Sequence, residues 1–233
     1  MPKVLVASPI YEGKEYIRKQ WVDAIKHLDY PNYDYLLVDN SKNTSYYRRL
    51  RREGVKIQHV DRGDNSRDAI AKSMNLIRQY ALDGDYDYLM SIESDLIPPP
   101  DIIQRLMRHR KPVVGSIYLI GFKNSPDQPL RPCIFKTRPN EKGMMSTYNC
   151  TPEESIKMMN TGLQQVHGVG LGCTLINKRI LEKYKFWYDP RFNNKHPDVY
   201  FYMQLHNDGV TAYVDTDVHV THYNSDWGKV QDM

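Results

Sequence analysis

The chain has 233 residues, of which 40% are hydrophobic and 26% are charged, as is typical of a globular protein with one large or two small domains. No apolar run approaches the roughly 18 residues of a membrane span, and the first residues lack the apolar core of a signal peptide. A net charge of +4 is too small to mark a dedicated nucleic-acid-binding protein. The three cysteines are widely spaced. Neither a disulfide framework nor a zinc cluster is therefore indicated, and we expect a cytoplasmic protein.

Strand and helix patterns alternate through the first half of the chain. Short apolar runs predict strands over 4–7, 35–38, 55–60, 85–92 and 113–118, and the helical spacing of apolar residues predicts helices over 15–28, 44–52, 66–82 and from 102 onward. This alternation predicts an α/β fold with a mostly parallel central sheet and helices on both faces. The carboxyl ends of parallel strands meet at one edge of such a sheet, where ligands bind. The strand ends at Pro9, at Asp39 and at Glu93–Asp95 should line that edge.

Two carboxylates follow the strand predicted over 85–92. Glu93 and Asp95 are two positions apart, and because side chains alternate along a strand, they should point the same way. Neighbouring carboxylates repel unless a cation compensates them, and Mg²⁺ is commonly held by one or two carboxylates together with substrate phosphates. The pair therefore predicts a metal site for a phosphorylated or nucleotide-linked substrate. The alternative is a solvated turn, with Asp101 as the N-cap of the next helix.

The middle of the chain changes character. From 119 to 160 the sequence is rich in turn residues and shows little periodicity. We expect an insertion here that acts as a lid or acceptor-binding loop, with a hairpin around 132–137. The expected organisation is one domain, 1–233, made of a donor-binding half (1–118), this insertion (119–160) and a catalytic half (161–233).

The last third contains three further candidate features. Gly168, Gly170 and Gly172 alternate in a strand-like run, which indicates a bulge or a close approach of the backbone to a ligand. Asp198 begins an apolar helical run, either as an N-cap or as a general base. His222 follows a strand predicted over 213–220 and is either structural or a metal ligand.

In this order, the segments resemble the GT-A glycosyltransferases, in particular the family-2-like group. The segment 6–12 resembles the first strand and donor-binding loop of that group, and 36–41 resembles its second strand with the base-contacting Asp. Glu93-Ser94-Asp95 resembles the Asp-x-Asp (DXD) motif. The segment 198–209 resembles the one that carries the catalytic Asp, and His222 resembles the late metal-binding His. The resemblance spans nearly the whole chain and implies a Rossmann-like GT-A fold.

The resemblance also implies an activity: transfer of a hexose from a UDP-, GDP- or TDP-linked donor to an acceptor hydroxyl. Asp95, Glu93 and His222 would hold Mn²⁺ or Mg²⁺, and Asp198 would be the general base of an inverting single displacement. The implied donor-binding residues are Pro9, Tyr11, Glu12, Asp39, Arg67, Lys72, Glu93, Ser94, Gly168 and Gly170. Trp187, Tyr188 or Trp227 would stack on a sugar.

The sequence departs from the family pattern at several points. Glu93 replaces the first Asp of the metal motif, Asp198 lacks an acidic neighbour, and Lys72-Ser73-Met74-Asn75 stands where Ala-Arg-Asn is usual. Arg67 or Lys72 would then supply the cation. Two alternatives stay open: the arginines of 48–52 suggest DNA as the acceptor, and the altered acids suggest a non-catalytic nucleotide-sugar-binding module. The acceptor is otherwise a glycan or a small molecule. A nucleotidyltransferase is disfavoured, since no glycine-rich loop follows the first strand.

Overall fold

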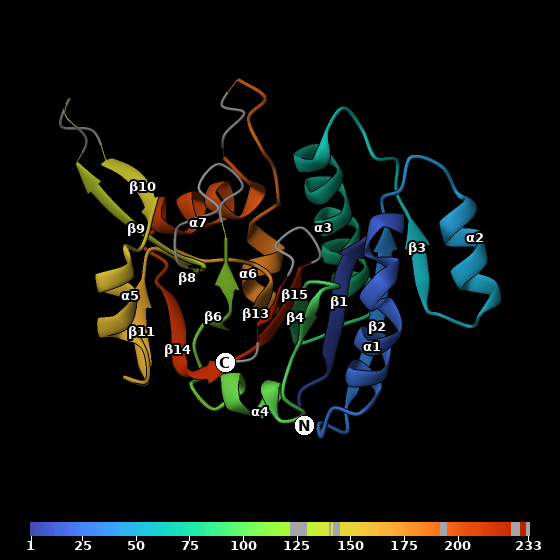
Figure 1. Cartoon of the computed structure of the whole chain (residues 1–233), viewed down its shortest axis with the longest axis horizontal. Helices are drawn as coiled ribbons and strands as arrows, with labels where there is room; N and C mark the ends of the chain where they lie inside the picture. The colour runs from blue at the N-terminus through green and yellow to red at the C-terminus, as the bar shows by residue number, and fades with distance from the viewer. Residues whose placement is uncertain (122–129, 140, 142–144, 192–194, 225–228, 232–233) are drawn as a thin grey trace.

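The computed structural model describes residues 1–121, 130–139, 141, 145–191, 195–224 and 229–231. Its centre is an eight-stranded sheet (Figure 1). In spatial order the strands are β11 (Leu163–Val166), β14 (Ala212–His219), β6 (Val113–Ile117), β13 (Cys173–Asn177), β4 (Tyr88–Ile92), β1 (Val4–Ile10), β2 (Tyr33–Asp39) and β3 (Ile57–His59). Strands β4, β1, β2 and β3 are parallel, β6 is parallel to β14, and β13 and β11 run antiparallel to their neighbours. The predicted α/β fold with a mostly parallel sheet is confirmed.

The strand order reverses direction at β1. From β1 the chain moves to β2 and then β3 on one side, whereas β4 returns to pair with the other side of β1. Because each connection is a right-handed crossover, helices that connect strands in one direction along the sheet lie on one face, and helices that connect strands in the other direction lie on the opposite face. Their connections therefore diverge above β1 and β4, and a crevice opens at the carboxyl ends of these two strands.

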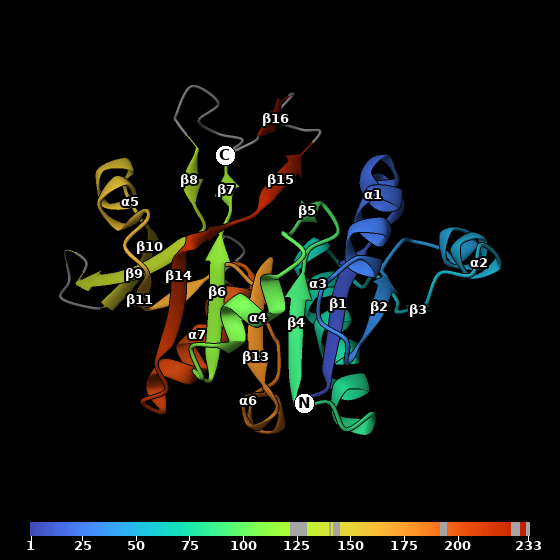
Figure 2. The ribbon, with the colours of Figure 1, turned by 90° about the horizontal axis from the view of Figure 1, so that it is seen from below.

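Helices cover both faces of the sheet. They are α1 (Glu15–Lys26), α2 (Ser45–Arg52), α3 (Ser66–Asp83), α4 (Ile102–Met107), α6 (Lys178–Lys183) and α7 (Pro197–Asn207). Figure 2 shows α4 in front of the sheet and α3 and α7 behind it, while α2 lies beside β3 at one edge. Each helix packs its apolar side against the sheet and leaves its polar side in solvent. In α1, for example, Trp21 and Ile25 are fully buried, whereas Lys19 and Gln20 are exposed. Among the described residues, no helix is long and apolar enough to cross a membrane.

The inserted segment contains more regular structure than its sequence predicts. Strands β7 (Leu119–Ile120) and β8 (Arg131–Pro132) pair, and β9 (Ile134–Pro139) pairs with both β10 (Met145–Asn149) and β12 (Gly168–Val169). The hairpin predicted around 132–137 is therefore misplaced, since this stretch is mainly part of the single strand β9, which pairs antiparallel with β10. Helix α5 (Pro152–Met158) was not predicted, although Thr151 and Glu154 form a capping box at its start.

A third small sheet joins the two halves of the chain. Strand β15 (Thr221–Asn224) pairs antiparallel with β5 (Leu96–Ile97) and with β16 (Lys229–Gln231). In this register His222 lies opposite Leu96, directly after Asp95. The C-terminal strand is thereby held against the carboxylate pair that follows β4.

One fully buried charge holds α4 to the sheet. The carboxylate of Asp215 in β14 has no solvent exposure, lies 2.7 Å from Nε2 of His109, and accepts a hydrogen bond of 3.1 Å from Arg108. Burial alone would raise the pKa of Asp215, but these partners hold it below its ordinary value. The folded-state pKa is thus lower than that of the unfolded chain. The resulting stability is present above the unfolded value of about 3.9 and is lost as the pH falls through the folded value.

We predict that Asp215→Asn lowers the free energy of unfolding by about 1–3 kcal/mol at pH 7, because it removes the buried charge that Arg108 and His109 contact. The difference from the wild type should shrink below about pH 4, where the carboxylate of the unfolded chain takes up its proton before that of the folded protein does. Denaturant unfolding at pH 7 and pH 3 measures both values. Asp23→Asn, at a side chain that is 76% exposed, is the control and should change stability by less than about 0.5 kcal/mol. An equal loss at both pH values would contradict the charge argument.

Candidate active site

A cavity of about 340 Å³ opens where the strand order reverses. It is lined by residues from the ends of β1 and β4, from the loops after β2 and β3, from α3, and from the start of α7. These are Pro9, Ile10, Tyr11, Lys14, Asn40, Arg62, Ser66, Ala69, Ile70, Met74, Ser91, Glu93, Ser94, Asp95, Leu171, His196, Pro197, Asp198 and His222. The expected edge of the sheet is therefore the site of the pocket, and its volume falls in the range of small-molecule sites.

Three potential metal ligands converge on the floor of the pocket. Glu93 and Asp95 come from the turn between β4 and β5, and β15 brings His222 to the same place. One ligand atom from each lies within 4.8 Å of the others. Nε2 of His222 is 3.4 Å from Oδ2 of Asp95. Asp95 as a residue is only 4% exposed. Two carboxylates and an imidazole make a donor set that suits Mn²⁺ and is also open to Mg²⁺.

His222 is oriented by groups outside the cluster. Its Nδ1 lies 2.7 Å from the carbonyl oxygen of Leu119, so Nδ1–H donates there and Nε2 is directed at Asp95. The ring of Tyr118 packs edge-on against the imidazole, with centroids 5.6 Å apart. A backbone carbonyl on the far nitrogen is the usual way in which proteins orient a metal-binding histidine. The residues present therefore fit a divalent metal.

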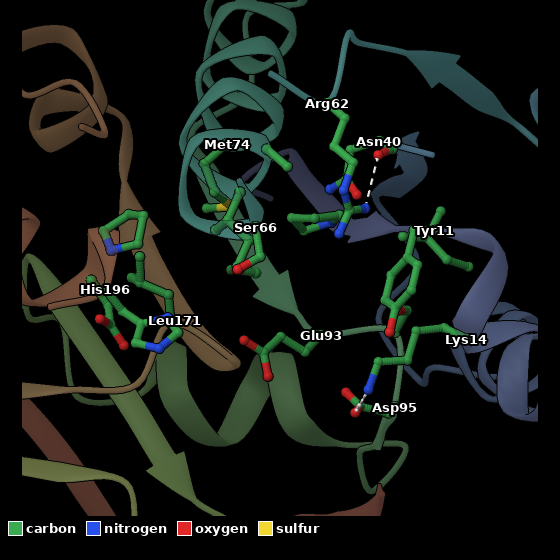
Figure 3. A pocket seen from close by; sticks show the side chains of 18 of the residues that line it. Tyr11, Lys14, Asn40, Arg62, Ser66, Met74, Glu93, Asp95, Leu171 and His196 are labelled. Carbon is green, nitrogen blue, oxygen red and sulfur yellow. Dashed lines mark hydrogen bonds and ion pairs between the residues drawn. The ribbon is translucent and has the colours of Figure 1, made fainter. Parts of the chain in front are cut away.

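The two carboxylates differ in electrostatic environment. Burial alone would raise the pKa of Asp95, but His222 and Lys14 lower it. Glu93 projects into the pocket, where its environment is less solvated than open water (Figure 3). That desolvation, followed by the charge of Asp95, raises the pKa of Glu93 to about 7. Asp95 is therefore the firmly ionised member of the pair.

Asp198 is in the first turn of α7 and lines the pocket. One of its carboxylate oxygens accepts a hydrogen bond of 2.7 Å from the N–H of Val199. Burial raises the pKa of Asp198, against the opposing effect of His196. A half-buried carboxylate with an elevated pKa, facing a cavity, is suited to accept a proton.

Another part of the pocket wall is made of planar and apolar side chains. The guanidinium of Arg62 lies 5.4 Å from the ring centroid of Tyr11 and donates to the carbonyl oxygen of Asn40 at 3.3 Å (Figure 3). Ile70 and Met74 of α3 also line the pocket. Planar and apolar groups of this kind accommodate an aromatic base. Lys14, Asn40 and Arg62 were not predicted, although each lies within four residues of the end of a strand at this edge.

Several predicted donor-binding residues do not line this pocket among the described residues: Glu12, Asp39, Arg67, Lys72, Gly168 and Gly170. Asp39 is fully buried, with one oxygen bound by the N–H and hydroxyl of Ser41 and the other 2.9 Å from Nδ1 of His59. Lys72 forms an ion pair of 2.8 Å with Asp68. Pro9, Tyr11, Glu93 and Ser94 do line it.

The alternating glycines make room for tyrosines. A Cβ on Gly168 would lie 2.6 Å from the ring of Tyr202, and one on Gly170 would lie 1.9 Å from the hydroxyl of Tyr118. Leu171, between the last two glycines, lines the pocket. The absence of side chains at these glycines thus lets Tyr118 pack beneath the pocket, where it also supports His222.

Comparison with solved structures finds similar folds at low sequence identity. A197 from STIV is 16% identical, with a TM-score of 0.53, and the match covers 95% of this chain and 86% of A197. TarS of S. aureus is 14% identical in two structures. One, with a TM-score of 0.54, is matched over 93% of this chain and 36% of TarS. The other structure, TarS 1-349 in complex with UDP, has a TM-score of 0.55. The match covers 93% of this chain and 60% of that TarS chain.

This chain therefore spans only about a third of the longer TarS structure and three fifths of the shorter one. No protein-family model matches the sequence, and no curated protein sequence does so. The structural likenesses, together with the strand order, show that the chain has the GT-A fold, as its motifs predicted.

We predict that Gly170→Ala lowers the free energy of unfolding by about 1–3 kcal/mol, because the new methyl group overlaps the buried Tyr118 and Cys133. Tyr118→Phe removes the nearest overlapping atom, so the double variant should lose less stability than the sum of the two single variants. Denaturant unfolding of the four proteins gives this coupling energy. Strict additivity would contradict the proposed contact.

Proposed function

We propose that this protein is a metal-dependent glycosyltransferase that moves a sugar from a nucleotide-sugar donor to an acceptor hydroxyl. One observation carries the proposal: Glu93, Asp95 and His222 share a single pocket with Asp198 at the point where the strand order reverses. Its structural neighbours A197 and TarS are glycosyltransferases, and one TarS structure contains UDP. These likenesses support the class of reaction, and the pocket supplies the residues for it.

In this proposal Asp95, Glu93 and His222 hold Mn²⁺ or Mg²⁺. When bound, the metal neutralises the donor diphosphate and stabilises the leaving group as a Lewis acid. Asp95 supplies a permanent negative charge, and His222 supplies Nε2 because its other nitrogen is held by Leu119. The base of the donor would lie between Tyr11, Arg62 and the apolar side of α3, in the same cavity.

Asp198 would take the proton from the acceptor hydroxyl as the bond to the sugar forms. Its position at the start of α7 fixes the carboxylate at the pocket wall, and burial raises its pKa, which makes it a stronger base than an exposed carboxylate. A single base opposite the leaving group gives a single displacement with inversion at the anomeric carbon.

An aromatic pair near α7 suits a sugar acceptor. Trp187 is 43% exposed, and its ring centroid lies 4.6 Å from that of Tyr200, one turn from the start of α7. Exposed, well-supported aromatic rings stack readily on sugar faces. Trp227 falls outside the described residues. The arginines of α2, proposed for a DNA acceptor, lie beside β3, and Arg49 is paired with Glu15 (Figure 1). We therefore propose a glycan or small-molecule acceptor.

We predict that Asp95→Asn abolishes metal-dependent donor binding while leaving the protein folded, because it removes the ionised ligand of the cluster. A thermal-shift screen of UDP-, GDP- and TDP-sugars, each with and without Mn²⁺, tests this. A ligand at a hundred times its Kd stabilises the native state by about 2.7 kcal/mol.

Asp101→Asn is the matched control for the Asp95 variant. Asp101 is an exposed acid in the next turn and makes no side-chain capping hydrogen bond, so its variant should keep the wild-type shift. The same metal-dependent shift in the Asp95 variant, or no shift with any sugar nucleotide in the wild type, would contradict the metal and donor site.

We predict that Asp198→Asn lowers kcat by about 10²–10⁴-fold, because the amide cannot accept the acceptor proton, while the donor-induced thermal shift is retained. Steady-state kinetics with the donor found in the screen measures the loss. Asp208→Asn, at the other end of α7, is the control and should retain activity. Donor binding without transfer or hydrolysis in the wild type would instead favour a non-catalytic binding module.

A further inference from the structure

Lys14 lies in the pocket but has no role in the mechanism above. It ends the short 3₁₀ helix η1 (Glu12–Lys14) that follows β1, and its backbone N–H donates to the carbonyl of Tyr11 at 2.9 Å. Its ammonium nitrogen is 2.5 Å from Oδ2 of Asp95 (Figure 3). The first loop of the sheet thus sends a positive charge onto the buried carboxylate that follows β4.

The oxygen that Lys14 contacts is the one that faces the metal cluster. Nε2 of His222 approaches the same Oδ2 at 3.4 Å, and a carboxylate oxygen of Asp95 lies in the group of potential ligands formed with Glu93 and His222. A divalent ion bound to this oxygen would lie within a few ångströms of the ammonium. The repulsion of two such cations at short range is large in a site with little water. Lys14 and a metal therefore compete for the charge of Asp95.

The side chain of Lys14 is able to leave this position. It is 22% exposed, compared with 6% for that of Asp95, and it forms part of the pocket wall. A lysine ammonium is a compact charge on a flexible stem with three freely oriented donors. It can exchange a carboxylate for another anion that enters the pocket, and a diphosphate is such an anion.

We propose that Lys14 is an internal counter-ion of the metal site. Without a donor it occupies the metal-binding oxygen of Asp95, and the donor diphosphate draws it away, so that the metal and the nucleotide bind cooperatively. The competition for Asp95 stands on the geometry alone, whereas the exchange onto the diphosphate rests on the proposed function. By linkage, the factor by which nucleotide tightens metal binding equals the factor by which metal tightens nucleotide binding.

The first experiment measures Mn²⁺ binding without nucleotide, by electron paramagnetic resonance titration of free Mn²⁺. Lys14→Gln keeps a hydrogen-bond donor without the charge, and Lys14→Met removes both. We expect each to lower the Kd of Mn²⁺ by about fivefold or more, the scale of a typical coupling between sites. Lys19→Gln, at an exposed lysine of α1, removes the same charge elsewhere and should leave the Kd within about twofold.

Thermal denaturation accompanies these titrations and reports on folding. Both Lys14 variants should unfold at a lower temperature than the wild type without metal, and should gain more stability from Mn²⁺, because the metal then replaces the missing cation. A purely structural ion pair would lower stability without changing Mn²⁺ affinity. An unchanged or weakened Kd in both Lys14 variants, or an equal tightening in Lys19→Gln, would overturn the competition.

The second experiment repeats the Mn²⁺ titration at saturating UDP, GDP and dTDP in turn. In the wild type at least one nucleotide should lower the Kd of Mn²⁺ by about fivefold or more, and the Lys14 variants should bring that factor closer to one. The same factor in wild type and variants would overturn the exchange. Failure of the proposed function has a different signature: the wild type would bind none of the nucleotides, while the Lys14 variants still tightened Mn²⁺ binding. That result would leave the competition standing and overturn the exchange.

Discussion

The buried charge of Asp95 is the constraint on which the site depends. Its carboxylate is almost inaccessible to water, and an unpaired carboxylate in such a place costs several kcal/mol. Lys14 from the loop after β1 and His222 from the C-terminal strand β15 offset that cost in the structure described here. Three distant segments of the chain are therefore held together by one negative charge, and a divalent metal would meet the same need.

Groups outside the metal cluster hold His222 in place beside Asp95. Leu119 fixes one nitrogen of His222, Tyr118 packs against its ring, and Gly170 leaves the space that the tyrosine hydroxyl occupies. The glycine-rich run thus acts on the metal cluster through a tyrosine. The glycine-rich segment therefore contributes to the site, although Gly168 and Gly170 themselves do not line the pocket. Such supporting contacts fix the orientation of ligands that would otherwise rotate freely.

Most of the fold could be predicted from the sequence because the signals are local. The helices α1 and α3 show apolar spacing along one side, and the strands β1, β2 and β4 are short apolar runs. The inserted segment was harder, because β9 pairs with β10 and with the remote β12. Pairing of this kind depends on residues far away in the sequence, so the hairpin was misplaced. Helix α5, by contrast, has a local signal, the capping box formed by Thr151 and Glu154.

For the site, the sequence by itself determined that Glu93 and Asp95 follow a buried strand and that Asp198 begins a helix, since both depend on neighbouring residues. The family resemblance had already grouped His222 with these acids, but only the tertiary structure decided that Lys14 meets Asp95 as well. Lys14 and His222 lie 81 and 127 positions from Asp95, and the order of strands in the sheets brings them together. The tertiary structure likewise pairs Asp39 with His59 and leaves the pocket to Asn40 and Arg62. The physical reason is that periodicity fixes the direction of a side chain, whereas strand order and register fix its partner.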